Sequence, residues 1–321
     1  MLNEYKVKIK KLHILLLLLF CINGGVAKSQ LIYPALYTDY DSSWTFNNLQ
    51  LIPIRLSTDG IPLDYLPEDV IEFSKALQSG KISIKEIHYM NGSDVNLLVV
   101  KNHTKKAILV NSGEIIAGGK QDRVIGETKL IPPGSEESYL NVFCVEKGRW
   151  AKKEKSFKFA GNADMDLRKK IDVSARQAEV WKEVDRQFKE RMIESESWSY
   201  NQLYPKATTS DSAYMNFFMN KMKHSDSSFA GFIAVAGKRI IGCELFASTN
   251  YTLKYYSQIL TSFIHSIKRR DGEPSVDLAE IKSFSNKLFT NEDTQVKFLK
   301  GRGVAHKYKE KTFHIVVYGE D

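Results

Sequence analysis

Short apolar stretches alternate with polar turns through the first half of the chain, and the pattern is densest between Gly113 and Trp150. Four apolar runs are separated there by glycine, proline and charged residues: Ile115–Ile116, Val124–Ile125, Leu130–Ile131 and Leu140–Val145. Short runs bounded by turn residues are typical of β-strands rather than helices. This region, which we call the hub, is therefore predicted to be a group of neighbouring strands.

The pattern changes after the hub. Residues Ala163 to Met192 contain no glycine or proline, and apolar side chains recur there at three- and four-residue steps. This spacing predicts one long amphipathic helix, with Asp164 as its candidate N-cap. Two strands, two helices and a final strand are expected to follow, at residues 229–236, 238–246, 250–270, 276–289 and 312–318. The order predicts an α+β fold with a β-rich N-terminal half, a central long helix and a C-terminal strand-helix-helix-strand portion.

The first 29 residues have the pattern of an export signal. Four lysines between positions 6 and 11 precede an apolar run from Leu12 to Ile22, and Ala27-Lys28-Ser29 offers small residues for cleavage. The apolar run is too short for a membrane span of about 20 residues. We therefore expect residues 1–29 to be a signal peptide and residues 30–321 to form a single exported domain, periplasmic or extracellular. No stable membrane span is expected in the mature chain.

Removal of the signal changes the charge balance. The full chain has 46 basic and 38 acidic residues, a net charge of +8. Residues 1–29 hold five lysines and one glutamate, which leaves 41 basic and 37 acidic residues and a net charge of +4. The mature chain lacks a basic stripe interleaved with aromatic residues, so nucleic acid is not an expected partner.

No metal-ligand spacing is present, so no metal site is expected. Cys144 and Cys243 lie in apolar runs and are expected to be buried thiols, with a disulfide between them as the alternative.

The hub also concentrates polar side chains at the motif GGKQDR, residues 118–123. Gly118 and Gly119 predict a tight turn that brings backbone close to a neighbour. A guanidinium with an amide beside it suits phosphate or carboxylate recognition. The candidate ligand-binding residues are Gly118, Gly119, Lys120, Gln121, Arg123, Arg149 and Trp150. The alternative is a structural Asp–Arg pair that locks a β-turn.

Three carboxylates of the hub are candidates for acid–base catalysis: Glu114, Asp122 and Glu146. Cys144 would act as a nucleophile only with a base nearby, and a core thiol is the favoured interpretation. Gln177, Trp181 and Glu244 are second candidates for the same cleft.

The order of the hub motifs resembles a known family. GGKQDR is followed by Pro132-Pro133, then by Phe143-Cys144-Val145-Glu146 and Gly148-Arg149-Trp150; a second block covers Ala236–Gly242. Together they resemble the ARPP-1 family, a domain associated with ADP-ribosylglycohydrolase and rhodanese-phosphatase proteins. The resemblance implies a link to ADP-ribose or nucleotide metabolism.

Two functions of different class follow. The first is a secreted module that binds a polar or phosphorylated small ligand, related to ADP-ribose or a nucleotide. The second is a hydrolase or transferase on such a substrate, with Glu146 and Asp122 as its carboxylates. Two carboxylates facing each other across a cavity would favour the enzyme. Carboxylates paired with arginines would favour the binding module or a structural role. The sequence assigns neither a cofactor nor an oligomeric state.

Overall fold

The computed structural model describes residues 36–41, 43–57, 66–89, 92–134, 136–151, 155–204, 208–224, 228–268 and 272–319. These residues belong to one compact unit, Ile32–Asp321. The predicted signal peptide, residues 1–29, lies outside the described residues. None of the described helices is both long and apolar enough to cross a bilayer.

A seven-stranded antiparallel sheet forms the larger half of this unit. Its main path runs β1-β3-β13-β14-β16-β15, and β2 also pairs with β3. The strands are β1 (Leu36–Thr38), β2 (Trp44–Phe46), β3 (Leu49–Leu56), β13 (Phe229–Ala236), β14 (Arg239–Phe246), β15 (Gly303–Tyr308) and β16 (Lys311–Tyr318). Every residue of β13 is buried, which shows that both faces of the sheet are covered at its centre.

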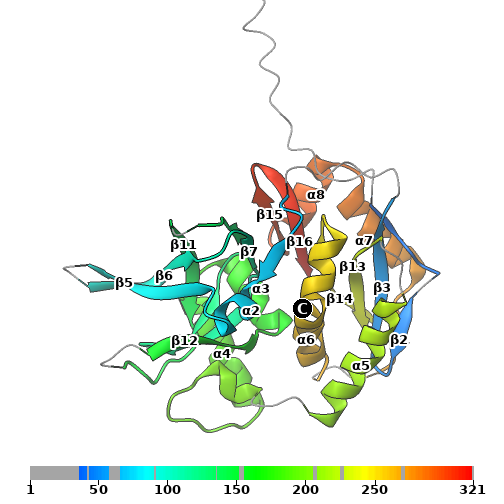
Figure 1. Ribbon diagram of the computed structural model, residues 1–321. Coiled ribbons are helices and arrows are strands. Elements are labelled where there is room, and N and C mark those ends of the chain that lie inside the picture. The colour runs from blue at the N-terminus through cyan, green and yellow to red at the C-terminus, as the bar shows by residue number, and fades with distance from the viewer. Residues whose placement is uncertain are drawn as a thin grey trace, which may run out of the picture. The chain divides into compact units, whose positions relative to one another are not determined.

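Helices cover this sheet. Helix α6 (Thr249–Ile267) packs against β13 and β14, and α5 (Thr209–Lys223) packs against α6 (Figure 1). Aromatic side chains of the sheet and α6 interlock, with Phe232 edge-on to both Tyr256 and Phe263. Helices α7 (Leu278–Phe289) and α8 (Glu292–Leu299) contact the edge strands β1 and β15 respectively.

Two smaller sheets contain the hub. A six-stranded sheet has the order β12-β8-β9-β11-β6-β5, and a three-stranded sheet has the order β10-β7-β4. The first consists of β5 (Ile82–Tyr89), β6 (Gly92–Asn102), β8 (Glu114–Gly119), β9 (Arg123–Ile125), β11 (Glu137–Cys144) and β12 (Lys155–Asn162). The second consists of β4 (Val70–Glu72), β7 (Ala107–Val110) and β10 (Lys129–Ile131), and α2 (Phe73–Gln78) packs beside it. The four hub strands are thus confirmed, and so is the α+β class.

The expected single helix over Ala163–Met192 is wrong. The chain forms α3 (Met165–Lys169), a π-helical turn at Lys170–Ser174 and then α4 (Gln177–Glu190). Ala175 has a left-handed backbone with φ of 50°, which separates the two helices. Apolar residues before and after this break enter the same core cluster, including Leu167, Ile171, Val180, Val184 and Phe188. The helical spacing of apolar residues therefore continues across the break between α3 and α4, so the sequence pattern alone does not reveal that break.

Other boundaries agree more closely with the expectation. Asp164 is the N-cap of α3 and accepts a hydrogen bond from the backbone N–H of Leu167. In the C-terminal portion, the short helix α8 is additional to the two helices that were expected. Its apolar residues Phe298 and Leu299 are buried, so α8 belongs to the packed fold.

Candidate functional site

The GGKQDR motif forms the tight turn between β8 and β9. Gly118 and Gly119 have φ values of 139° and 53°, a region that side chains rarely adopt. A Cβ atom at Gly119 would lie 2.4 Å from Cζ of Phe157 and 2.6 Å from Oε1 of Glu86. The turn therefore needs glycine at position 119 for both its backbone conformation and its packing.

Both carboxylate oxygens of Asp122 accept hydrogen bonds. Oδ1 accepts hydrogen bonds from the backbone N–H of Gly118 at 3.0 Å and from Arg149 at 2.9 Å. Oδ2 accepts from the hydroxyl of Ser199 at 2.8 Å and from the amide of Asn201 at 3.0 Å. The side chain thus joins the hub turn to the segment that follows α4.

Glu146 and Arg149 complete this arrangement. Nε of Arg149 donates to both carboxylate oxygens of Glu146 at 2.8 Å, and Glu146 also accepts from the backbone N–H of Asp122 at 3.0 Å. The other guanidinium nitrogens reach the backbone oxygens of Gly118, Gly119 and Lys120. We call the set of Asp122, Glu146 and Arg149 the clasp. Its two carboxylates are buried, and the Arg149 side chain is 24% exposed.

The remaining hub candidates surround the clasp. Nη2 of Arg123 lies 3.4 Å from Glu86, and its Nη1 donates to the backbone oxygen of Gln121 at 2.9 Å. The Gln121 amide donates to the backbone oxygen of Glu146 at 2.7 Å. At the surface, the ammonium of Lys120 lies 5.2 Å from the centre of the Trp150 ring, which is 54% exposed. The structure therefore brings all the candidate ligand-binding residues together.

Glu114 lies apart from the clasp, at the start of β8. Its Oε2 accepts a hydrogen bond from the backbone N–H of Asn111, and its Oε1 is buried with no partner among the described residues. Burial raises the pKa of Glu114 to about 8, against the opposing effect of the Asn111 hydrogen bond. The carboxyl is therefore protonated at neutral pH.

Glu244 also lies elsewhere, as a fully buried residue of β14 in the seven-stranded sheet. Its two carboxylate oxygens accept hydrogen bonds from the Arg168 guanidinium at 2.6 and 3.0 Å, which makes a bidentate ion pair. Its Oε1 also lies 2.9 Å from Nε2 of His314. Burial opposes its ionisation, but Arg168 and His314 outweigh that effect and lower the pKa of Glu244 to about 2. Glu244 thus joins α3 to β14 and β16 by a buried charge pair.

Gln177 and Trp181 belong to α4. The Gln177 amide accepts from the backbone N–H of Cys144 and donates to its backbone oxygen, which fixes α4 against β11. Cys144 and Cys243 are both free and buried, as expected for core thiols. The pKa of the Cys144 thiol is raised, chiefly by burial, so its environment does not favour a thiolate nucleophile.

These contacts bear on what the hub can do chemically. Asp122 and Glu146 share Arg149 between them and have further hydrogen bonds to backbone or side-chain donors. By the criterion set from the sequence, carboxylates paired with an arginine favour a binding module or a structural role over acid–base catalysis. Within the described ranges, the structure brings together no group of three His, Cys, Asp or Glu side chains that could hold a metal ion.

A second site, which the sequence interpretation did not select, lies between α7, α8 and the ends of β14 and β16. It is a cavity of about 420 Å³. Four basic residues line it together with one carboxylate and three aromatic rings: Lys238, Arg239, Lys287 and Arg302, then Glu280, then Phe284, Phe298 and Tyr318. We call this cavity the α7–α8 cleft.

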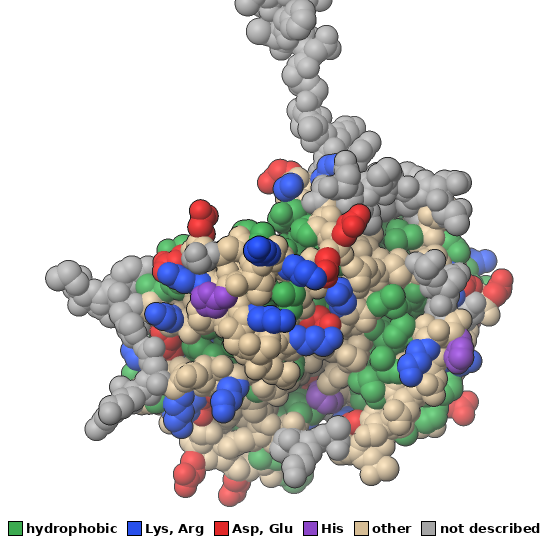
Figure 2. All heavy atoms as spheres, viewed as in Figure 1, with side chains coloured by type: hydrophobic (Ala, Val, Ile, Leu, Met, Phe, Trp, Pro, Cys, Tyr) green, Lys and Arg blue, Asp and Glu red, His purple; other side chains and the backbone are tan. Residues whose placement is uncertain are grey.

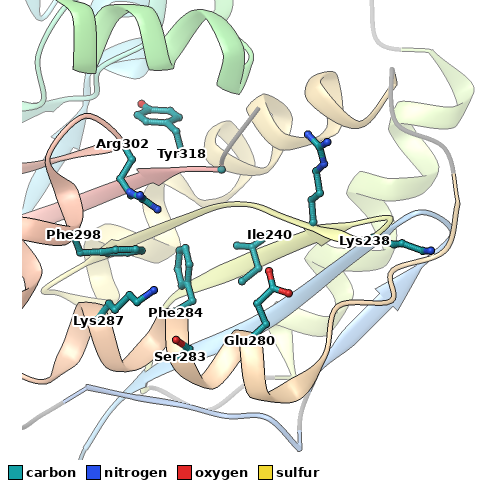
Figure 3. A pocket seen from close by; sticks show the side chains of 11 residues that line it. Lys238, Ile240, Glu280, Ser283, Phe284, Lys287, Phe298, Arg302 and Tyr318 are labelled. Carbon is teal, nitrogen blue, oxygen red and sulfur yellow. The ribbon is translucent and has the colours of Figure 1, made fainter.

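Figure 3 shows how its side chains lie. The rings of Phe284 and Phe298 face the hollow, and Lys287 and Arg302 approach Phe298 from different elements. The ammonium of Lys287 lies 5.8 Å from the centre of the Phe298 ring, and the guanidinium carbon of Arg302 lies 5.0 Å from it. The two cations lie on opposite sides of the Phe298 ring, and this combination of cations and aromatic surface is suited to an anionic ligand.

The cleft was missed because its cations come from segments far apart in the sequence. Lys238 precedes β14 and Arg239 begins it, Lys287 is in the last turn of α7, and Arg302 precedes β15. Each resembles an ordinary surface charge when taken alone. Figure 2 shows lysine and arginine side chains elsewhere too, interspersed with carboxylates on the drawn face. The only local signals were the glycines beside the cations, Gly237 and the pair Gly301 and Gly303.

Comparison with known proteins gives one family. A family model described as the ARG and Rhodanese-Phosphatase-superfamily-associated Protein domain, ARPP-1, matches residues 38–317. Comparison with curated proteins and with solved structures gave no match. The match covers the hub and every lining residue of the α7–α8 cleft except Tyr318 and Gly319. The chain therefore belongs to the ARPP-1 family.

Proposed function

We propose that this protein binds a phosphorylated small ligand of the ADP-ribose or nucleotide type in the α7–α8 cleft. The observation that carries the proposal is the position of Lys287 and Arg302 at the Phe298 ring, in a cavity whose lining also includes the basic residues Lys238 and Arg239 and a single carboxylate. Phosphate oxygens are satisfied by such donors, and arginine can bind them through two parallel hydrogen bonds.

The shape of the cleft supports the same class of ligand. Its volume of about 420 Å³ falls in the range of small-molecule sites, which is roughly 300–1,000 Å³. Phe284 provides apolar surface beside the cations, on which a base or sugar face could stack. The association of the family with ADP-ribosylglycohydrolase, which is part of its description, is consistent with a ligand of this kind.

The clasp has a positioning role in this proposal. Its carboxylates bind Arg149 rather than facing an open cavity. The alternative function, a hydrolase or transferase that uses Glu146 and Asp122, would require these carboxylates to leave their partners. It therefore has less support than ligand binding.

Calorimetric titration of the full chain with ADP-ribose, ADP, ribose 5-phosphate and inorganic phosphate tests the proposal. Lys287→Gln removes a cleft cation from an exposed helical position and should weaken phosphate binding by about tenfold or more, because a charged hydrogen bond contributes ~1.5–3 kcal/mol. Lys297→Gln is the matched control, since Lys297 is an exposed lysine of α8 that does not line the cleft. Equal binding by both variants, or no binding of any phosphorylated ligand by the unmodified chain, would count against it.

We also propose that the protein is exported. The basic start, the short apolar run and Ala27-Lys28-Ser29 support cleavage of residues 1–29. Intact-mass measurement on protein from the native host should give a chain that starts at Gln30 or Lys28. A chain that retains Met1 would contradict export by cleavage.

A further inference from the structure

A second, smaller cavity lies where β12, the 3₁₀ turn Tyr200–Leu203 and α6 meet. It measures about 70 Å³ and shares no lining residue with the α7–α8 cleft. Nine residues line it: Ile115, Ala160, Gly161, Asn162, Tyr200, Asn201, Tyr204, Thr261 and His265. We call it the Tyr200–His265 cavity.

The lining combines apolar and polar groups and carries no charged side chain. Its polar part offers two carboxamides, three hydroxyl groups and an imidazole, each of which can hydrogen-bond a neutral partner. Burial and the nearby ammonium of Lys268 lower the pKa of His265 to about 4, so its ring is neutral at pH 7. This lining suits a neutral ligand with hydroxyl groups. An anionic ligand would find no cationic side chain in the lining to pair with.

Several of these groups have hydrogen-bonding capacity left after their contacts within the protein. The Tyr200 hydroxyl accepts from the backbone N–H of Asp164 at 2.9 Å, which leaves its own proton for another acceptor. The Asn201 amide nitrogen donates to Asp122, which leaves its carbonyl oxygen. Nδ1 of His265 is buried with no partner among the described residues. Unused polar groups around a cavity are unfavourable unless water or a ligand satisfies them.

The backbone of β12 departs from regular strand pairing beside the cavity. The register of β12 against β8 shifts between Phe159 and Gly161, which is a β-bulge. Gly161 has φ of 137°, and a Cβ atom there would meet nothing within 4 Å. The bulge and the glycine therefore leave backbone exposed beside the cavity.

Contacts with neighbouring side chains hold the lining residues of the cavity in place. The ring of His265 stacks on Tyr204, with centroids 3.9 Å apart and planes 12° apart, and the Tyr204 hydroxyl donates to Asp164 at 2.9 Å. The clasp holds the opposite wall, because Asp122 accepts from Ser199 and Asn201 while Tyr200 donates its backbone N–H to Val145. The hub motif thus positions the residues that face the cavity, which is the preorganisation that a binding site needs.

We propose that the Tyr200–His265 cavity binds a small neutral ligand with adjacent hydroxyl groups, such as a polyol or one edge of a sugar ring. A vicinal diol presents two donors and two acceptors at short spacing, which matches the amide, hydroxyl and imidazole groups of the lining. The cavity volume admits a few heavy atoms, so a larger sugar would insert one edge and leave the rest in solvent.

Saturation-transfer NMR with D-ribose and glycerol as probes tests this proposal on the full chain. His265→Phe keeps a ring to stack on Tyr204 but removes both nitrogens, and Asn162→Ala removes an amide from the lining. Each change should weaken probe binding by about tenfold while the melting temperature stays close to that of the unmodified protein. Asn216→Ala, at an exposed position of α5, is the matched control and should leave binding unchanged.

The outcomes separate this site from the α7–α8 cleft. Lys287→Gln should leave ribose binding intact, and His265→Phe should leave phosphate binding intact. The proposal is overturned if neither probe binds the unmodified protein, which would mean that the cavity holds only water. It is also overturned if both cavity variants bind ribose as well as the control does.

Discussion

The clasp and the α7–α8 cleft both gather charged residues, but they handle charge in opposite ways. In the clasp, Arg149 lies against two buried carboxylates, and Asp122 has a hydrogen-bond partner on each oxygen. In the cleft, four basic residues surround a hollow with one carboxylate among them. Removing one partner of a matched buried pair destabilises the fold, whereas an excess of basic residues around open space favours an anionic ligand.

This difference shows that a sequence motif rich in charged and polar residues can have a structural role. In the hub, Asp122 pairs with Arg149, 27 positions away, and Arg123 pairs with Glu86, 37 positions away, so these charges are matched once the strands pair. The cleft draws its cations from three distant segments of the chain, and its lining includes one carboxylate, Glu280 of α7. The matched charges of the clasp are the reason why we propose the cleft, rather than the hub, as the ligand site.

The largest effect is expected from breaking the clasp. Arg149→Ala leaves Asp122 and Glu146 without their cation, and removing one partner of a buried pair costs about 3–5 kcal/mol. Because the Arg149 side chain is 24% exposed, we expect the lower end, about 3 kcal/mol of unfolding free energy by chemical denaturation. Lys147→Ala, which breaks an exposed pair with Asp185, should cost less than ~0.5 kcal/mol. Similar losses in the two variants would show that the clasp is not a structural unit.

Gly119→Ala tests the turn that supports the clasp. The change should cost about 2 kcal/mol, because the added Cβ both strains the backbone and meets Phe157 and Glu86. Gly80→Ala separates the two causes. Gly80 has a similar φ of 66° with nothing within 4 Å, so only the strain of roughly 1 kcal/mol should remain there. If thermal denaturation gives equal losses, the close packing at Gly119 makes no contribution.

A smaller effect is expected from the pH dependence of Glu114. Its pKa is raised in the folded state to about 8, so the contribution of this group to stability is present at low pH and is lost as the pH rises towards 8. Glu114→Gln cannot titrate. Between pH 6.5 and 8, above the ordinary pKa of histidine, its unfolding free energy should gain about 1.5 kcal/mol relative to the unmodified protein. Parallel pH profiles from denaturant titration would mean that Glu114 is ionised in the fold.

The sequence predicted the elements with local patterns and missed those that depend on long-range contacts. The hub strands were predictable because glycine and proline bound each apolar run, and the cap at Asp164 because its side chain acts locally. The break at Ala175 was not, since the buried side chains on either side of it keep the helical period. The meeting of Lys287 and Arg302 at the Phe298 ring depends on the packing of α7 and α8 against the sheet, which no local pattern encodes.

The central claim is that ligand charge is recognised in the α7–α8 cleft and not at the clasp. The most direct measurement is calorimetric titration of ADP-ribose into the Lys287→Gln, Arg302→Gln double variant, beside the unmodified protein and Arg149→Ala under conditions where it remains folded. We expect the double variant to lose about a hundredfold or more in affinity with little change in melting temperature, because two charged contacts are removed, while Arg149→Ala keeps its affinity. Undiminished binding by the double variant, together with lost binding by folded Arg149→Ala, would place the site at the clasp and contradict the claim.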